Sequence, residues 1–195
     1  EKNLETRKLI EEKLISIKLQ NEVKIYLKDS IEKDYNDTDL TIVATTSLHR
    51  LEVCEEIILK EYSGTLILEK FLFPTLDILK VGEKVLSSWN GSIYVNQWMR
   101  ISPLKSCFKK FINKSIDIKV IGNIGLLTNG VHYIDLVKET LLIKDLRVSL
   151  NNSKCKSILP SKREGYSEIK GTLNFYSKEK KINLSLIDED SFLDK

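Results

Sequence analysis

The chain has 195 residues, of which 42% are hydrophobic and 30% are charged, so it can bury the core of one large or two small domains. Its 31 basic and 28 acidic residues leave a net charge of only +3, which argues against a dedicated nucleic-acid binder, because such proteins usually carry a basic stripe. The apolar runs are far too short to span a membrane, and no signal peptide is visible.

The first predicted elements alternate between helices and strands. Residues 4–19 favour a helix, because apolar residues recur along it at helical spacing and Asn3 can cap its first turn. The segment "EVKIYLKD" is a short candidate strand that leads into a helical segment near 28–34. The continuous β-branched run "DLTIVATT", at 39–46, is typical of a strand that is buried on both faces.

The next helix and strand follow this buried strand directly. Ser47 is placed to cap the helix and Gly64 to stop it. The apolar face expected for this helix consists of Leu48, Leu51, Cys54 and Ile58. Leu66–Leu68 is the next predicted strand, and another helix is expected after Pro74–Thr75. The apolar residues expected along that helix are Leu76, Ile78, Leu79, Val81 and Val85.

A further strand, at 91–99, precedes a helix with Ser102 as its cap and Pro103 at its first position. The residues expected to face inward on this helix are Leu104, Cys107, Phe108 and Phe111. Residues 21–113 thus alternate strand and helix, which predicts a parallel α/β sheet with right-handed crossovers. Ligands bind at the carboxyl ends of the strands in such sheets. The strand ends of interest are Thr45-Thr46-Ser47, Glu69-Lys70 and Asn96-Gln97.

The pattern changes after about residue 114. Strands separated by polar turns are predicted in "DIKVIGN", "DLRVSLNN", "GYSEIKGTLNFYS" and "KKINLSLID", and one helix near 130–142 interrupts them. We therefore predict an α/β protein with two domains. Residues 1–114 form a partial doubly wound, Rossmann-like parallel sheet, and residues 115–195 form an α+β domain with a largely antiparallel sheet.

The cysteines and histidines do not form a metal-binding pattern. Cys54, Cys107 and Cys155 are widely spaced without a CxxC pair, and His49 and His132 are far apart in the sequence. A zinc site is therefore not expected. Three unpaired cysteines are typical of reduced thiols, which favours a cytoplasmic protein.

Four segments occur in an order and spacing that are characteristic of one protein family. The segments "VATTSLHRLEVCEEII", "LILEKFLF", "VNQWMRISPLKSCFKKFI" and "GLLTNGVHYIDL" together resemble motifs of the glucose–fructose oxidoreductase / inositol dehydrogenase family. The segment "SKREGYSEIKGTLNF" also looks like members found with surface-polysaccharide sugars. The resemblance implies an oxidoreductase that transfers a hydride between NAD or NADP and a sugar, sugar nucleotide or polyol.

The sequence departs from this family at its start. The family opens with a strand, a glycine-rich turn and a helix that hold the dinucleotide pyrophosphate, whereas the 8 glycines here include no GxGxxG. Because "EKNLETRKL" is similar to the segment after the family's second strand, about 30–40 further residues are expected upstream. The second domain is likewise expected to be incomplete at its C-terminal end.

Two substitutions affect the chemistry that the resemblance implies. Phe71 stands where the family usually has Pro, often after a cis peptide bond. Since a cis Lys–Phe bond costs roughly 2.5–4 kcal/mol, a trans bond is expected here. Thr128 stands four residues before His132, where many members carry Asp. Thr128 and its neighbour Asn129 can hydrogen-bond a sugar hydroxyl but carry no charge at neutral pH.

The resemblance assigns catalytic roles to Lys70 and His132. Lys70 would stabilise the developing alkoxide of the substrate and help to move its proton, and a solvated loop lysine is the alternative. His132 follows Gly130 near a helix start and would be the acid–base residue, and a structural histidine is the alternative. Asp135, three residues further on, could orient the imidazole or could serve only in packing or capping.

Other residues are assigned to the binding of cofactor and substrate. The cofactor is expected to contact Thr45, Thr46, Ser47, Glu69, Lys70 and Asn96, and the substrate Arg100, Thr128, Asn129 and His132. The alternatives are helix capping by Ser47, a surface acid at Glu69 and a surface salt bridge at Arg100. His49 is interpreted as a surface residue and Trp98 as a core or interface residue.

Three functional hypotheses follow. The first is the enzyme just described, in the cytoplasm, with a small sugar-type substrate and without a nucleic-acid, membrane or metal partner. The resemblance also implies a homo-oligomer formed through the sheet of the second domain. The second is a truncated or non-catalytic relative that acts as a binding or scaffold module, which Phe71, Thr128 and the missing glycine motif favour. The third is an unrelated α/β sugar-binding protein.

Overall fold

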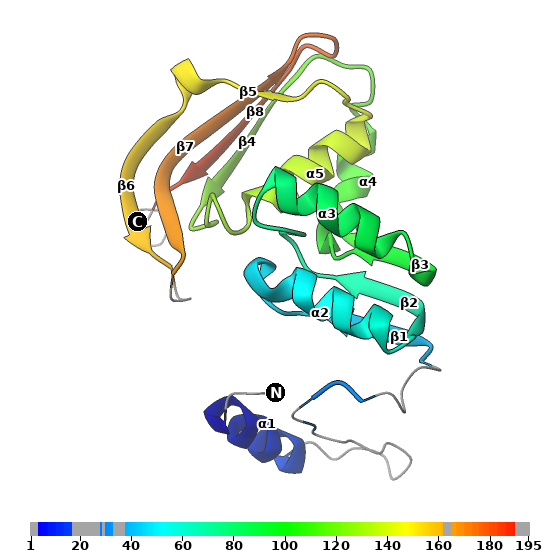
Figure 1. The fold of residues 1–195 in the computed structure, drawn as a ribbon. Coiled ribbons are helices and arrows are strands. Elements are labelled where there is room, and N and C mark those ends of the chain that lie inside the picture. The colour runs from blue at the N-terminus through cyan, green and yellow to red at the C-terminus, as the bar shows by residue number, and fades with distance from the viewer. Residues whose placement is uncertain (1–3, 17–27, 29, 33–37, 162–164, 190–195) are drawn as a thin grey trace. The chain divides into compact units, whose positions relative to one another are not determined.

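The computed structural model describes residues 4–16, 28, 30–32, 38–161 and 165–189, which belong to two units that divide between Asn96 and Gln97 (Figure 1). The helix predicted at 4–19 is described as α1 (Leu4–Ser16). The cap Asn3, the candidate strand "EVKIYLKD" except for Lys28, and much of the helical segment near 28–34 lie outside the described residues.

The first unit contains a sheet of three strands, in the order β1 (Leu40–Val43), β2 (Ser63–Leu68) and β3 (Asn90–Val95). Both pairs of neighbouring strands are parallel, which confirms the predicted parallel sheet. Val43, Leu68 and Val95 are partners in register at the carboxyl ends. The residues that follow these three positions therefore leave the sheet at the same edge.

Two helices, α2 (Ser47–Leu59) and α3 (Leu76–Leu86), share one core with β1 and β2, whereas every residue of β3 is exposed. The core residues are Val43, Cys54, Ile57, Leu66, Leu68, Phe73, Leu86 and Trp89. The expected apolar faces are wrong for Leu48, Leu76 and Val81, which are exposed. In α2 the buried residues are Arg50, Cys54 and Ile57, of which Cys54 was expected, and their spacing puts them on one face of the helix. Burial raises the pKa of the Cys54 thiol to about 11.

Two glycines in this unit allow a close approach of neighbouring elements. A Cβ at Gly82 would lie 2.1 Å from the ring of Phe73, so α3 packs against that ring only with glycine there. Gly64 has a φ of 82°, and a Cβ on it would lie 2.3 Å from the carbonyl oxygen of Thr38. Gly64 therefore belongs to β2. The expectation that it stops α2 is wrong, because α2 already ends at Leu59.

The second unit contains a mixed sheet with the strand order β4 (Ile116–Gly122), β8 (Ile182–Asp188), β7 (Ser167–Ser177) and β5 (Arg147–Val148), and β6 (Lys154–Pro160) also pairs with β7. β4 and β8 are parallel and the other pairs are antiparallel, which confirms a largely antiparallel sheet. The sequence pattern does not indicate β6, because every residue of this strand is exposed and no buried face marks it.

The helix predicted near 130–142 is α5 (Gly130–Leu141), which buries Val137 and Leu141 in one core with residues of β4 and β8. The 3-10 helix η2 (Trp98–Ile101) and the short helix α4 (Leu104–Lys109) pack on α5. Because of this packing they lie with the second unit, so the units divide earlier in the chain than the predicted boundary after residue 114.

The α4 segment buries less than its sequence suggested. Phe108 and Ile112 pack against the core of the second unit, whereas Leu104, Cys107 and Phe111 are exposed. A helix of only six residues turns a single narrow side toward its neighbours, which explains the difference. The strand predicted at 91–99 is also shorter, since β3 ends at Val95.

The described residues lack two features, a membrane-spanning helix and a cluster of metal ligands. No helix among them has the length and apolarity needed to cross a membrane. No group of three or more histidine, cysteine or acidic side chains among them is arranged to hold a metal ion.

Candidate functional site

The strand ends of the first unit are joined by hydrogen bonds beyond the sheet itself. The backbone N–H of Asn96 donates to the carbonyl of Leu68 at 2.8 Å, and that of Glu69 donates to the carbonyl of Val43 at 3.2 Å. The Asn96 side chain donates through Nδ2 to Glu69 Oε1 at 2.6 Å. Glu69 and Asn96, which were predicted to lie at neighbouring strand ends, are thus in direct contact.

A buried arginine connects the same edge of the sheet to the loop that carries Lys70. Arg50 of α2 is 1% exposed, and its guanidinium donates to the carbonyls of Thr45, Phe71 and Leu72, the last at 2.9 Å. Sequence reasoning missed Arg50. Its spacing from Cys54 and Ile57, four and seven residues, places all three on one helical face and was the available signal.

The peptide bond between Lys70 and Phe71 is cis, so the expected trans bond is wrong. That expectation considered the dipeptide alone, whereas the carbonyls of Phe71 and Leu72 are both held by Arg50. The chain therefore has the backbone form that the resemblance associates with Pro at this position. Lys70 is partly exposed, and its Nζ lies 6.0 Å from the centre of the Phe71 ring.

The residues after β1 form the entry to α2. Thr46 occupies the N-cap position, and its side chain makes no capping hydrogen bond. The expected capping by Ser47 is therefore wrong, because Ser47 is already the first helical residue. Thr45 is exposed, and Thr46 and Ser47 are partly exposed. His49 lies on the surface as interpreted, 3.6 Å from a carboxylate oxygen of Glu52.

In the second unit, His132 lies in the first turn of α5 and is only 4% exposed. Its ring nitrogen Nδ1 is 2.8 Å from Oε1 of Gln97. The indole of Trp98 meets the imidazole edge-on, with ring centres 5.8 Å apart and planes inclined by 64°. Two consecutive residues, Gln97 and Trp98, therefore hold the ring of His132.

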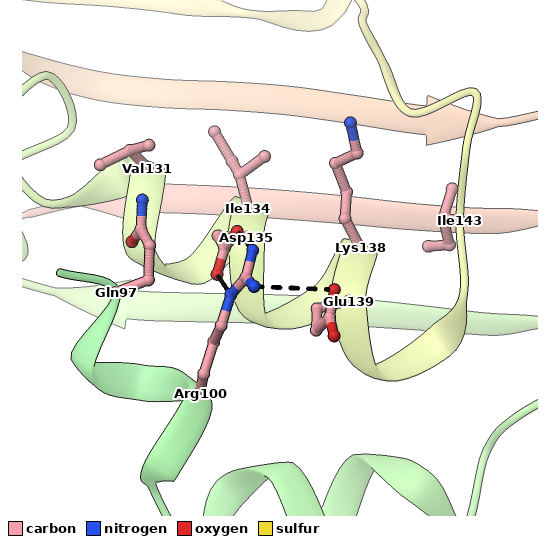
Figure 2. A pocket seen from close by; sticks show the side chains of 8 residues that line it. All are labelled: Gln97, Arg100, Val131, Ile134, Asp135, Lys138, Glu139 and Ile143. Carbon is pink, nitrogen blue, oxygen red and sulfur yellow. Dashed lines mark hydrogen bonds and ion pairs between the residues drawn. The ribbon is translucent and has the colours of Figure 1, made fainter. Parts of the chain in front are cut away.

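Asp135 is bonded to Arg100, and Gln97 occupies the place at His132 that was considered for Asp135 (Figure 2). Arg100 donates through Nε and Nη2 to the two carboxylate oxygens of Asp135 at 2.7 and 2.6 Å, and its Nη1 is 3.9 Å from Glu139. The hydrogen bond to Asp135 raises the pKa of Arg100. The salt bridge considered as the alternative for Arg100 is thus present.

A pocket of about 380 Å³ lies beside this ion pair (Figure 2). Its lining residues are Gln97, Arg100, Val131, Ile134, Asp135, Lys138, Glu139 and Ile143. All come from η2, α5 and the segments next to them. The pocket offers hydrogen-bond donors and acceptors on one side of α5. Gln97, which contacts His132, is one of its lining residues.

Thr128 and Asn129 hold the loop that leads into α5. Glu168 of β7 accepts from the Thr128 hydroxyl at 2.6 Å and from the backbone N–H groups of Leu127 and Thr128 at 2.6 and 3.0 Å. Asn129 donates to the carbonyl of Ile124 at 3.0 Å. Burial opposes ionisation of Glu168, but these hydrogen bonds outweigh it and lower the pKa of the carboxyl. Substrate binding by Thr128 and Asn129 stays a prediction.

Replacing Glu168 by Gln is expected to destabilise the protein at pH 7 by about 1 kcal/mol, because hydrogen bonds to a partly exposed carboxylate are lost. Since the folded-state pKa lies below the usual 4.5, this stability is present above that pH and is lost as the pH falls through the folded value. Urea unfolding at pH 7 and pH 3 measures it. Glu179→Gln, at an exposed turn, is the control, and equal effects of the two substitutions would contradict the assignment.

Comparison with known proteins identifies the fold. No family model matches the chain, and neither does any curated protein. Among solved structures, the dehydrogenase MviM from Clostridium difficile matches with a TM-score of 0.68 and 16% identity, over 94% of this chain and 59% of that one. A myo-inositol 2-dehydrogenase from Lactobacillus plantarum matches with a TM-score of 0.58 and 16% identity, over 81% and 52%.

The same fold occurs in a super-repressor mutant protein of yeast. The super-repressor mutant of Gal80p from Saccharomyces cerevisiae matches with a TM-score of 0.59 and 14% identity, over 82% of this chain and 52% of that one. The chain therefore spans between 52% and 59% of the length of these three structures. At such identities the likeness establishes the fold, and the chain has the fold of dehydrogenases of the glucose–fructose oxidoreductase / inositol dehydrogenase type.

Proposed function

We propose that this chain is part of an oxidoreductase that transfers a hydride between NAD(P) and a carbinol carbon of a sugar, sugar nucleotide or polyol. The observation that carries the proposal is the arrangement at the carboxyl edge of the first sheet. Glu69 and Lys70 directly follow the middle strand, and Glu69 is bonded to Asn96 at the end of the next strand. In an open α/β sheet this edge is the place where a nucleotide binds.

The residues at this edge fit the nicotinamide end of such a cofactor. The Glu69 carboxylate and Asn96 amide can hydrogen-bond ribose hydroxyls, and Thr45, Thr46 and Ser47 add hydroxyls at the start of α2. The glycine motif that would hold the pyrophosphate is not among the residues of this sequence. When bound, the nicotinamide ring supplies the carbon that accepts or gives up the hydride.

Lys70 and His132 would handle the proton of the substrate hydroxyl. A carbinol loses its hydroxyl proton as the hydride leaves its carbon, so negative charge develops on oxygen. The Lys70 ammonium would stabilise this charge. His132 would accept the proton, because an imidazole titrates near neutral pH. Arg100, Thr128 and Asn129 would bind other oxygens of the substrate.

The proposal also includes the cellular setting that the resemblance implies. We place the protein in the cytoplasm as a homo-oligomer formed through the sheet of the second unit, with a role in surface-polysaccharide metabolism. Exposed apolar side chains on β5 and β6 support such an interface: Val148 is 45% exposed, Ile158 70% and Leu159 40%.

Cofactor binding by the intact protein that carries this segment tests the proposal. NADH and NADPH are each titrated up to millimolar concentration while tryptophan fluorescence is recorded. Quenching is expected from Trp98, which is half exposed, or from Trp89, which is buried in the first core. Trp98→Phe and Trp89→Phe variants assign the signal to one residue. No quenching and no energy transfer to either dinucleotide would count against hydride chemistry.

A non-catalytic binding module is the second candidate. The super-repressor mutant of Gal80p has the same fold, and Phe71 and Thr128 replace the residues that the resemblance expects. This candidate predicts dinucleotide binding without turnover of any member of a panel of sugars, sugar nucleotides and polyols. Turnover of one of them under the same conditions would exclude it.

A further inference from the structure

The hydrogen bond between Gln97 and His132 carries information about where the imidazole proton lies. The partner of Nδ1 is the amide oxygen Oε1 of Gln97, at 2.8 Å. An amide oxygen has no proton and can only accept. Nδ1 must therefore donate, and in the neutral ring the proton is on Nδ1 and absent from Nε2.

We propose that Gln97 is the positioning residue of His132, and that its amide oxygen keeps the imidazole in the tautomer whose Nε2 accepts the substrate proton. This inference rests on the proposed function, in which His132 takes the hydroxyl proton. It deepens that function, because it names the accepting nitrogen and the side chain that selects it.

The packing around His132 supports a fixed ring. His132 is 4% exposed, so water has little access to the imidazole and does not compete with Gln97 for the hydrogen bond of Nδ1. Trp98, next to Gln97 in the chain, meets the ring edge-on at 5.8 Å and limits its rotation. The main-chain N–H of His132 is bonded to the carbonyl of Asn129 at 3.0 Å, which fixes the backbone from which the ring extends.

The partner that Gln97 provides is neutral, and this affects the charge of the imidazole. A carboxylate in the same place would favour the imidazolium form, whereas an amide does so much less. The charged groups on α5 are Asp135, Lys138 and Glu139, and those on η2 and α4, which pack against it, are Arg100, Lys105 and Lys109. The strands that share its core carry Asp117 and Lys119 on β4, Glu168 and Lys170 on β7, and Asp188 on β8.

The acids nearest to the start of α5 are already bonded to other groups. Asp135 accepts both hydrogen bonds of Arg100. Glu168 accepts from the loop before α5, as described above, and Asp188 is paired with Lys170 at 2.8 Å. The neutral Gln97 is thus the group that faces Nδ1.

The tautomer can be measured without cofactor or substrate. The two histidines of this segment, His132 and His49, are assigned in the ¹⁵N-labelled intact protein from the signals that disappear in His132→Gln and His49→Gln variants. At a pH where the ring is neutral, His132 is expected to show a protonated Nδ1 and an unprotonated Nε2. His49, with a side chain 69% exposed beside Glu52, is the internal control.

Two variants separate positioning from simple packing. Gln97→Leu removes the acceptor and is expected to shift the His132 signals toward the other tautomer. Gln97→Glu retains an acceptor, keeps the proton on Nδ1, and is expected to raise the midpoint of the His132 titration by about 1–3 pH units. The His49 midpoint should not move in either variant. A purely structural Gln97 would change stability in both variants without changing the tautomer.

The results distinguish this inference from the proposed function. A proton on Nε2 in the wild type, or an unchanged tautomer in Gln97→Leu, overturns the role of Gln97 whether or not the protein has activity. If Gln97→Leu does not fold, the tautomer of the wild type and the titration midpoint of Gln97→Glu still test the role of Gln97. Where turnover is found, the acid limb of kcat/KM should move upward in Gln97→Glu together with the titration midpoint, and an unmoved limb also overturns it.

Discussion

Replacing Arg50 by Met is expected to lower the free energy of unfolding by about 3 kcal/mol, since three partly buried hydrogen bonds are lost and each contributes about 1 kcal/mol. The three acceptors concerned are the carbonyls of Thr45, Phe71 and Leu72. Met fills part of the volume of the arginine stem, so the measured loss reports mainly the missing hydrogen bonds. Urea unfolding of the wild type and of Arg50→Met measures the difference, provided that the two proteins have the same m value.

Two further variants make the Arg50 experiment specific. Arg147→Met changes an exposed arginine of β5 and is expected to alter stability by less than about 0.5 kcal/mol. Arg50→Lys keeps a positive charge but replaces a planar fork by a point charge, so an intermediate loss is expected. An Arg50→Met protein as stable as Arg147→Met would show that the hydrogen bonds to the loop contribute nothing to folding.

The elements that could be predicted are those whose apolar pattern or capping residue lies within the element or directly beside it in the sequence. The β-branched run ending at Val43 and the apolar run ending at Leu68 both became strands of the parallel sheet. Thr75 caps α3 through its hydroxyl, 3.3 Å from the N–H of Ile78. β6 could not be predicted, because an exposed edge strand buries no face and therefore leaves no alternation in the sequence.

The candidate site shows the same division between local and distant effects. Alignment of parallel strand ends was enough to place Glu69 and Asn96 at the same edge of the sheet, and the structure brings them into hydrogen-bond contact. The cis bond after Lys70 was not predictable from Phe71 alone, because the loop carbonyls are held by Arg50, which is about twenty residues away in the chain. Rules that consider only neighbouring residues do not include a distant partner such as Arg50.

His132 and Asp135 illustrate a competition that spacing cannot resolve. Three residues apart on a helix, they lie close enough to interact. The structure instead pairs Asp135 with Arg100, a bidentate contact with a cation, and leaves Gln97 for the imidazole. A guanidinium is a stronger partner for a carboxylate than a neutral ring is, so the choice follows from charge once the distant partner is known.

Replacing Lys70 by Ala is expected to lower kcat for hydride transfer by about 10²–10⁴-fold, because the alkoxide loses its cation and a group that helps to move the proton. Binding of NADH is expected to change much less, since Glu69, Asn96 and the hydroxyls before α2 remain. Stopped-flow recording of NADH absorbance, together with a fluorescence titration, separates the two effects.

The second unit contains a matched control for this substitution. Lys114 also lies over an aromatic ring, with Nζ 5.9 Å from the centre of Phe111, compared with 6.0 Å for Lys70 and Phe71. Lys114→Ala removes the same kind of local contact away from the strand ends, so kcat should stay within a factor of about two. Lys70→Arg keeps the charge but cannot release a proton at neutral pH, so activity between wild type and Lys70→Ala would indicate both roles. If Lys70→Ala and Lys114→Ala were equally active, Lys70 would neither stabilise the alkoxide nor help to move its proton, and its charge at the end of β2 would serve folding or solubility.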